Sequence, residues 1–482
     1  MQQARTQLMT EGPIWRRILV FSIPLIVGSL LQQLYNTVDT LVIGNFLGGD
    51  ALAAVGAGTT IIHLLLSLFA GLSTGASVVI AQYYGARNDK MVRRAVRTTA
   101  AFTLVSGIAL TVLGVWLSGE ILSWIGTPAS VFRDARLYLA VYFAGILPLM
   151  VYNMGAAVLR AVGDSRTPLY YLAAAALVNT VLDVLFVAVF DAGVGGVALA
   201  TFIAQTAAAL LVLAKMQHTR DVYRLDTLKA LRTLRTLRPS TLLRTPQRPS
   251  FHGMPLDLGI LRNVLRIGIP AGLQQTAMAI SNLVVQSTIN SFGTVAMAAW
   301  NVYGKLDGMV VLPVISFGLA MTTFTGQNIG AGMRDRVLRG TKTGLWMSCA
   351  FAVAISALVC AYGVDFLRIF TAEAEILEYG RRMIFGLAPY YFLIAVMYAL
   401  SGVVNGAGFT LPTMGIMLAS LCVVRIACLK LTTHFLGDIR AVFAAYIVSW
   451  SVCCVGLAAY YIKGRWRTAL DRTSPPRDPA EI

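Results

Sequence analysis

Residues 82–86 read Gln-Tyr-Tyr-Gly-Ala, and residues 327–331, 245 positions later, read Gln-Asn-Ile-Gly-Ala. The agreement extends beyond this motif at an offset of 245 or 246, in Leu47-Gly48 and Phe292-Gly293, Arg94 and Arg339, Ile23-Pro24 and Ile269-Pro270, and Asn36 and Asn282. The chain is therefore built from two copies of a unit of roughly 200 residues, an internal repeat that is typical of membrane transporters.

Composition places both copies in a membrane. Hydrophobic residues make up 57% of the chain and charged residues 13%, against about 25% charged residues in a soluble domain. Residues 1–15 are polar and the apolar run after them is long, so we expect a first membrane span and no cleavable signal peptide. The lipid bilayer is the expected partner of most of the surface.

Twelve stretches contain the roughly 20 mainly apolar residues that a helix needs to cross a bilayer. They lie at approximately 14–44, 50–82, 94–117, 131–160, 166–190, 193–216, 259–290, 295–327, 336–361, 374–404, 411–433 and 438–463. We predict an all-α integral membrane protein with twelve transmembrane helices in two pseudo-symmetric six-helix lobes around a central cleft. The predicted parts are an N-tail (1–13), an N-lobe (14–216), a basic linker (217–258), a C-lobe (259–463) and a C-tail (464–482).

Basic residues predict the orientation in the membrane. With the N-terminus in the cytoplasm, 30 of the 39 lysines and arginines fall in inner segments and six in outer loops. This positive-inside asymmetry predicts a multi-pass protein of the cytoplasmic membrane with both termini in the cytoplasm. Because the charge is spread over the inner loops, the net charge of +17 does not indicate nucleic-acid binding.

The 217–258 linker has a leucine at every third position from Leu225 to Leu237, with lysine and arginine between them. A period of three drifts around an α-helix and makes no single apolar stripe. Two interpretations stay open: a mobile linker, or a segment that rests on anionic headgroups at about 1 kcal/mol per basic residue.

Ionisable residues inside membrane spans are costly, so each is a candidate for function. In the first span, Gln32, Asn36 and Asp39 share one helical stripe, where Gln32 and Asn36 are supporting polar residues. In the fifth span, Asn179 and Asp183 are four residues apart and share a face.

Helix geometry brings part of this set to one depth. At a rise of 1.5 Å per residue, Asp39, Asp183 and Thr201 of the sixth span lie roughly 8, 10 and 12 Å from the outer ends of their helices. Two neighbouring carboxyl groups either share a proton or bind a cation. Asp39, Asn179, Asp183 and Thr201 are therefore the predicted ion-coupling site, for H⁺ or for Na⁺ as the bound metal ion. The alternative is a carboxyl pair that only locks helices together.

The second half offers one acid and one base inside spans. Asp307 lies near the middle of the eighth span, and Arg425 of the eleventh span is its candidate partner. A structural ion pair and a contact with substrate in the cavity both fit these positions.

No enzyme signature is present. Gly71-Leu72-Ser73-Thr74-Gly75 fits the nucleophile pattern G-x-S-x-G, but it lies inside an apolar span, where small-residue helix packing accounts for it. The six cysteines show no C-x-x-C spacing and the four histidines are scattered. We expect no enzymatic activity, no catalytic residue and no cofactor beyond a coupling ion.

Together these residues resemble the multidrug and toxic compound extrusion (MATE) antiporters over roughly residues 14–463. The resemblance rests on Ile23-Pro24, Val38-Asp39-Thr40, the doubled Gln-x-x-Gly-Ala motif, Gly-Asp-Ser-Arg-Thr-Pro at 163–168, and Asn179-x-x-x-Asp183. It implies twelve helices in two lobes around a V-shaped cleft. It also implies secondary active export of organic cations or amphiphiles, in exchange for Na⁺ or H⁺, by alternating access.

The resemblance implies roles for individual residues as well. In such proteins a first-span aspartate, a fifth-span asparagine and aspartate, and a sixth-span threonine form the cation site of the N-terminal lobe. These roles fall on Asp39, Asn179, Asp183 and Thr201. Pro24 stands where a first-span proline is associated with helix bending.

Departures from the pattern favour the first lobe for coupling. NorM-like members carry acids in the seventh and tenth spans, whereas here the seventh has Gln274 and Gln275 and the tenth has no acid after Glu378. The chain is more similar to the DinF-like or MepA-like bacterial branch. The alternative function is a lipid-linked oligosaccharide or other lipid-type flippase of the same superfamily, for which Lys305 and Arg425 are few basic residues. We expect a monomer.

Overall fold

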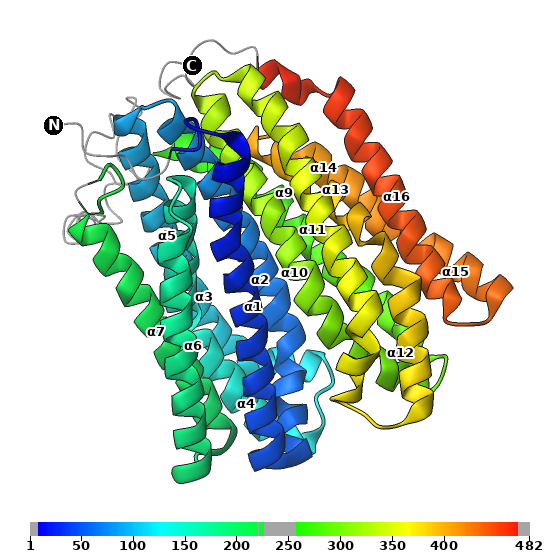
Figure 1. The fold of residues 1–482 in the computed structure, drawn as a ribbon. Helices are drawn as coiled ribbons and strands as arrows, with labels where there is room; N and C mark the ends of the chain where they lie inside the picture. Colours follow the sequence, from blue (N-terminus) through cyan, green and yellow to red (C-terminus); the bar gives the residue numbers. More distant parts are fainter. Residues whose placement is uncertain (1–7, 220, 226–256, 471–482) are drawn as a thin grey trace. The chain divides into compact units, whose positions relative to one another are not determined.

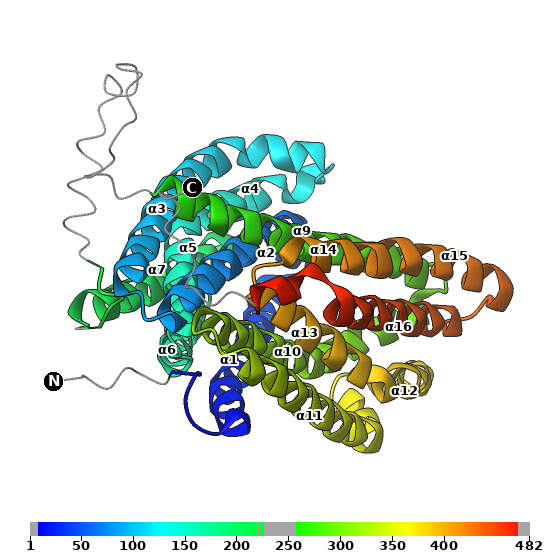
Figure 2. The same ribbon diagram turned by 90° about the horizontal axis from the view of Figure 1, so that it is seen from above.

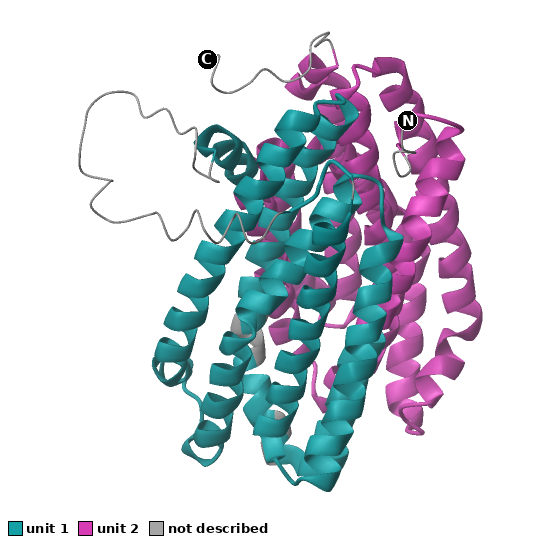
Figure 3. Cartoon of the chain, turned by 90° about the vertical axis from the view of Figure 1, so that its left-hand side faces the viewer, with its two compact units in different colours: residues 1–7, 34–266, 476–482 teal, residues 8–33, 267–475 magenta. Residues whose placement is uncertain are grey.

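The computed structural model describes residues 8–219, 221–225 and 257–470, and every regular element in these ranges is helical. Most of the predicted 217–258 linker and parts of both predicted tails lie outside the described residues, and the predicted part boundaries remain predictions. The chain divides into two compact units, drawn in teal and magenta in Figure 3. Unit 1 holds the described residues from 34 to 266, and unit 2 holds residues 8–33 and 267–470.

Unit 1 is a bundle of long helices joined by short turns (Figure 1). Its elements are the second part of α1 (Ile14–Val42), the π-helical turn η1 (Ile43–Leu47), α2 (Gly48–Gly85), α3 (Asp89–Trp124), α4 (Ala129–Ala144), α5 (Ile146–Ala161), α6 (Arg166–Val184), the π-helical turn η2 (Leu185–Val189), α7 (Gly193–His218) and the first turns of α9 (Leu258–Asn290). Its core contains the fully buried Leu139 of α4 and Val197 of α7.

Unit 2 repeats this type of bundle. Its elements are the first part of α1, the rest of α9, α10 (Thr294–Gly330), α11 (Arg334–Arg368), α12 (Ala374–Leu387), η4 (Ala388–Tyr390), α13 (Tyr391–Gly406), α14 (Thr410–Leu418), the π-helical turn η5 (Ala419–Val424), α15 (Arg425–Leu436), α16 (Arg440–Lys463) and η6 (Arg465–Ala469). Its largest core cluster joins residues of α10, α12, α13 and α16, among them Tyr303, Met383, Tyr391 and Leu457.

The helical membrane fold class is confirmed, but the number twelve is not. In the described part of the chain, ten helices are long and apolar enough to cross a membrane, and the pair α4 and α5, bent by 43°, makes eleven if it is one span. The predicted seventh span is the 33-residue helix α9, which does not reach the required hydropathy. Its polar residues Gln274, Gln275 and Asn282 lower that hydropathy.

The motif Gly-Asp-Ser-Arg-Thr-Pro forms the turn between α5 and α6. Gly163 adopts a φ of +94°, a left-handed conformation that glycine adopts without a Cβ penalty. The Asp164 carboxylate then accepts hydrogen bonds from the backbone N–H groups of Arg166 and Thr167, at 3.1 and 3.0 Å, and from the Thr167 hydroxyl at 2.6 Å. These bonds satisfy donors of the first turn of α6, so the motif starts the helix that carries Asn179 and Asp183.

In unit 2, the second copy of the doubled motif binds the chain segment before α1. The buried Gln327 side chain accepts a hydrogen bond from the Met9 N–H at 2.9 Å, and Asn328 donates to the Met9 carbonyl at 3.4 Å. Arg336 donates to the same carbonyl at 3.1 and 3.2 Å and to the carbonyls of residues 11–12. The motif residues therefore satisfy backbone groups of a segment more than 300 residues away.

Small residues bring α10 and α13 into close contact within unit 2, and the two helices run side by side (Figure 2). Gly402 and Gly406 are one turn apart on α13. A Cβ added to Gly402 would overlap the carbonyl oxygen of Gly318, and one added to Gly406 would overlap that of Thr322. This is the small-xxx-small packing of membrane helices, in which missing side chains let backbones approach.

We expect Gly402→Ala to destabilise the protein by about 1–3 kcal/mol, because the obstructing atom is backbone and cannot rotate away. The measurement is the thermal unfolding midpoint of purified protein in detergent. Gly415→Ala in α14 is the matched control, because a Cβ there meets nothing within 4 Å. Equal midpoints for the two variants would contradict the packing argument.

Candidate functional site

Three helices of unit 1 bring the predicted polar residues together. The second part of α1 carries Asp39, α6 carries Asn179 and Asp183, and α7 carries Thr201. Asn179 and Asp183 are each only 1% exposed, whereas Asp39 and Thr201 are half-buried. Polar side chains buried this deeply in an apolar bundle need partners, so their hydrogen bonds define the site.

Asn179 is the centre of the hydrogen-bond network. The amide orientation that satisfies both of its groups donates from nitrogen to Asp183 Oδ2 at 2.8 Å and accepts at oxygen from the Thr201 N–H at 3.2 Å. Asn179 thus links α6 to α7 and fixes one oxygen of the Asp183 carboxyl group.

The other oxygen of Asp183 has no such donor. Asp183 Oδ1 is buried, and no group in the described part of the chain donates a hydrogen bond to it. The side chain within hydrogen-bond reach of Asp183 is a second carboxyl group, that of Asp39. Ionised carboxylates only accept hydrogen bonds, so this contact is favourable when a proton or a cation lies between the two groups.

Tyrosines surround the carboxyl pair, and the sequence analysis did not identify them. Tyr35 of α1 lies close to Thr201, and Tyr138 and Tyr142 of α4 lie within electrostatic range of Asp39. The rings of Tyr138 and Tyr142 have centroids 6.2 Å apart. A signal for Tyr35 was available, because it precedes Asp39 by four residues and so shares its helix face.

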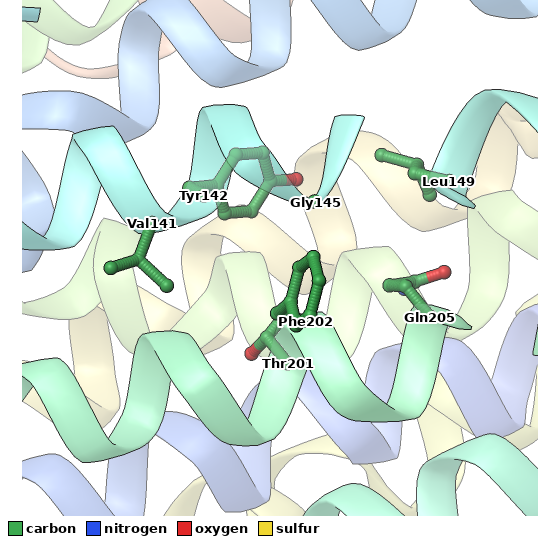
Figure 4. A pocket seen from close by; sticks show the side chains of 7 residues that line it. All are labelled: Val141, Tyr142, Gly145, Leu149, Thr201, Phe202 and Gln205. Atoms are coloured by element: carbon green, nitrogen blue, oxygen red, sulfur yellow. The ribbon is translucent and has the colours of Figure 1, made fainter. Parts of the chain in front are cut away.

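A small pocket lies beside this site (Figure 4). Its lining residues come from α4, α5, α7 and the turn at Gly145, and they are Val141, Tyr142, Gly145, Leu149, Thr201, Phe202 and Gln205. Thr201 and Tyr142 belong to both the pocket and the surroundings of the carboxyl pair. The pocket therefore provides space next to the polar cluster within unit 1.

The supporting residues of α1 lie outside the network. Gln32 and Asn36 are exposed, and the Asn36 carbonyl accepts a hydrogen bond from the Thr40 hydroxyl at 2.9 Å. Pro24 lies inside α1, which continues as one helix from Ile14 to Val42. A proline there removes a backbone donor and is a common place for a helix to bend.

Asp307 in unit 2 does not form the ion pair with Arg425 that was one of its two interpretations. Its Oδ1 atom accepts hydrogen bonds from the hydroxyl groups of Tyr391 at 2.6 Å and Tyr303 at 3.3 Å. The two hydroxyls are themselves 2.8 Å apart. Two neutral donors thus bond the carboxylate, and the other interpretation of Asp307, a contact with substrate, stays a prediction.

Arg425 has neutral partners of its own. It donates from Nε to the Ser449 hydroxyl at 3.1 Å and from Nη1 to Asn282 Oδ1 at 3.3 Å. Its guanidinium lies over the ring of Tyr446, 4.3 Å from the centroid. In the described part of the chain it forms no ion pair with an acid.

Comparison with known proteins gives a consistent result. A protein-family model described as MatE matches residues 24–185 and 270–429, one stretch in each copy of the repeat. The probable multidrug resistance protein YpnP of Bacillus subtilis is 30% identical over 460 residues, which cover 95% of this chain and 97% of YpnP. The multidrug export protein MepA of Staphylococcus aureus is 22% identical over 415 residues, 85% of this chain and 83% of MepA.

Solved structures show the same fold. A multidrug resistance MATE family transporter of the MOP superfamily, in an outward-facing conformation, has a TM-score of 0.85 at 22% identity. The match covers 98% of this chain and 100% of that one. At this identity the likeness concerns the fold alone.

The carboxyl pair leads to a prediction about stability. Asp183→Asn supplies an N–H donor toward Asp39 and keeps an oxygen toward Asn179, so we expect a thermal unfolding midpoint equal to or above that of the parent. Asp183→Leu leaves the buried Asn179 amide without its acceptor, at a cost of about 1–3 kcal/mol. If the asparagine variant is as destabilised as the leucine variant, Asp183 Oδ1 does not lack a donor.

Proposed function

Because this chain belongs to the MatE family of multidrug efflux transporters, we propose that it is a secondary active exporter of amphiphilic or cationic compounds. Inward movement of Na⁺ or H⁺ drives the export, and alternating access couples the two movements. The observation that carries this proposal is the buried carboxyl group of Asp183, whose Oδ1 atom has no donor among the described residues and whose side chain lies within hydrogen-bond reach of Asp39.

The coupling ion acts on the electrostatics of this pair. With a proton or a cation bound, the carboxyl groups of Asp39 and Asp183 attract each other and α1 and α6 are held together. Without it, two carboxylates in an apolar environment repel each other and lose their contact. An ion that binds one conformation better shifts the population toward that conformation by its difference in affinity.

The side chains fit either ion. A proton would satisfy Asp183 Oδ1 with a single hydrogen bond to Asp39. Na⁺ would use oxygen ligands from the carboxyl groups, the Asn179 amide and the Thr201 hydroxyl, which are the ligands hard cations prefer. The ion is the transported species, and we propose no other cofactor and no enzymatic reaction.

We place both termini and the 217–258 linker in the cytoplasm and the protein in the cytoplasmic membrane as a monomer. The basic residues in the inner segments support this orientation. The names of YpnP and MepA, a probable multidrug resistance protein and a multidrug export protein, do not favour the alternative of a lipid-type flippase.

We expect Asp39→Asn and Asp183→Asn each to reduce gradient-driven export at least tenfold, because a neutral amide cannot exchange a proton or cation under the gradient. The measurement is dye export in inverted membrane vesicles with separate Na⁺ and H⁺ gradients. Asp307→Asn is the matched control and is expected to keep its ion dependence, since tyrosine hydroxyls satisfy that carboxylate. Normal export by both first-lobe variants would falsify the assignment.

Orientation has its own test, in a variant whose six native cysteines are replaced by serine. We expect a cysteine at Met333, in the turn between α10 and α11, to resist an impermeant thiol reagent in intact cells. A cysteine at Ala372, between α11 and α12, is expected to react. The reverse pattern would invert the proposed topology.

A further inference from the structure

Arg425 is a buried cation whose contacts are all neutral. Only 2% of the residue is exposed, at the start of α15 directly after the π-helical turn η5. A buried guanidinium without a counter-ion is costly, and more so inside a membrane span. We therefore expect the charge of Arg425 to make a favourable interaction that offsets the cost of burying it.

The Arg425 guanidinium has more hydrogen-bond donors than there are acceptors around it. It carries five N–H groups, and two of them bond the Ser449 hydroxyl and the Asn282 amide oxygen. The other three have no acceptor in the described part of the chain. Tyr446 covers one face of the group, and Tyr398, Cys422 and Cys453 are the other groups within electrostatic range. All of these surroundings are uncharged residue types.

A stripe of polar residues on α9 includes a hydrogen-bond partner of Arg425. The stripe consists of Gln275, Asn282, Gln286 and Asn290, which follow one another at spacings of seven, four and four residues. Gln275, Asn282 and Asn290 are exposed, and Gln286 is half-buried. Polar residues in membrane helices face water or substrate and not lipid. Asn282 belongs to the stripe and bonds Arg425, so the buried charge lies one hydrogen bond behind an exposed polar surface.

We propose that Arg425, Asn282 and Ser449 form an anion site in unit 2 that binds the carboxylate, sulfonate or phosphate group of an amphiphilic compound. A guanidinium fork matches these groups and can bind them through two parallel hydrogen bonds. The inference deepens the proposed export function, because it names the substrate class that unit 2 recognises. The anionic group belongs either to a soluble amphiphile or to a lipid headgroup.

The test compares two dyes that differ in one charge. Anilinonaphthalene sulfonate is anionic, and phenylnaphthylamine is its neutral analogue. Binding to the purified full-length protein in neutral-lipid nanodiscs is measured against empty nanodiscs. We expect Arg425→Gln to weaken binding of the sulfonate at least tenfold and to change binding of the neutral dye less than twofold. Lys430→Gln, which removes an exposed charge from the same helix, is the control and is expected to change neither.

A second variant keeps the test valid if Arg425→Gln does not fold. Asn282→Asp places a carboxylate within 3.3 Å of Arg425, so the arginine gains an internal counter-ion. We expect this variant to be at least as stable as the parent and to bind the sulfonate dye at least tenfold more weakly. Unchanged sulfonate binding in Asn282→Asp, or equal effects of Arg425→Gln on both dyes, would overturn the proposal.

Two further readouts follow. The first distinguishes the two sources of the anionic group, and the second tests the proposed export function separately. Displacement of the sulfonate by phosphatidylglycerol in the nanodisc identifies a lipid headgroup as the ligand, and no displacement identifies a soluble amphiphile. Both results support an anion site. Gradient-driven export of the neutral dye tests the export function separately, because it does not depend on the charge of Arg425.

Discussion

The contact between the carboxyl groups of Asp39 and Asp183 is the constraint on which the rest of unit 1 depends. Two acceptors face each other in an apolar bundle, so the surrounding groups must hold them in place without neutralising them. Asn179 does this by donating to Asp183 Oδ2 while Thr201 fixes its oxygen. The π-helical turns η1 and η2 begin four and two residues after the two aspartates. Such turns change the direction of a helix and are frequent at functional sites, so α1 and α6 are irregular just beyond the pair.

Unit 2 uses related helices with different chemistry. Its acid, Asp307, is satisfied by two tyrosine hydroxyls, and its base, Arg425, is only partly satisfied by neutral groups. The two copies therefore share a helical scaffold but carry different charged groups: two carboxyl groups in contact in unit 1, and a separate acid and base in unit 2. The motif at 327–331 has a structural role in unit 2, because the Gln327 side chain accepts a hydrogen bond from the backbone N–H of Met9.

The sequence predicts a residue's depth well and its neighbours less well. Asp39, Asp183 and Thr201 could be placed at one level because the rise of a helix per residue is constant. Depth does not determine which way a side chain faces, which is why the sequence left an ion pair between Asp307 and Arg425 open as one of two interpretations, and the structure gives both residues other partners. The actual partners of Asp307, Tyr303 and Tyr391, look like ordinary core aromatics in sequence. No local pattern indicates a contact such as that between Met9 and Gln327, which lie 318 residues apart.

Incomplete hydrogen bonding separates the sites that can respond to a ligand from those that cannot. Asp307 Oδ1 already accepts hydrogen bonds from the hydroxyl groups of Tyr303 and Tyr391, so an ion or solute at this atom would have to replace bonds that already exist. In the described ranges, Asp183 Oδ1 lacks a donor and three N–H groups of Arg425 lack an acceptor, so a ligand at either place gains interactions that the free protein does not have. If such a gain is larger in one conformation than in the other, the ligand has different affinities for the two, and that difference can drive a conformational change. Asp183 and Arg425 are therefore the positions at which the binding of a cation and of an anion, respectively, can shift the population of conformations.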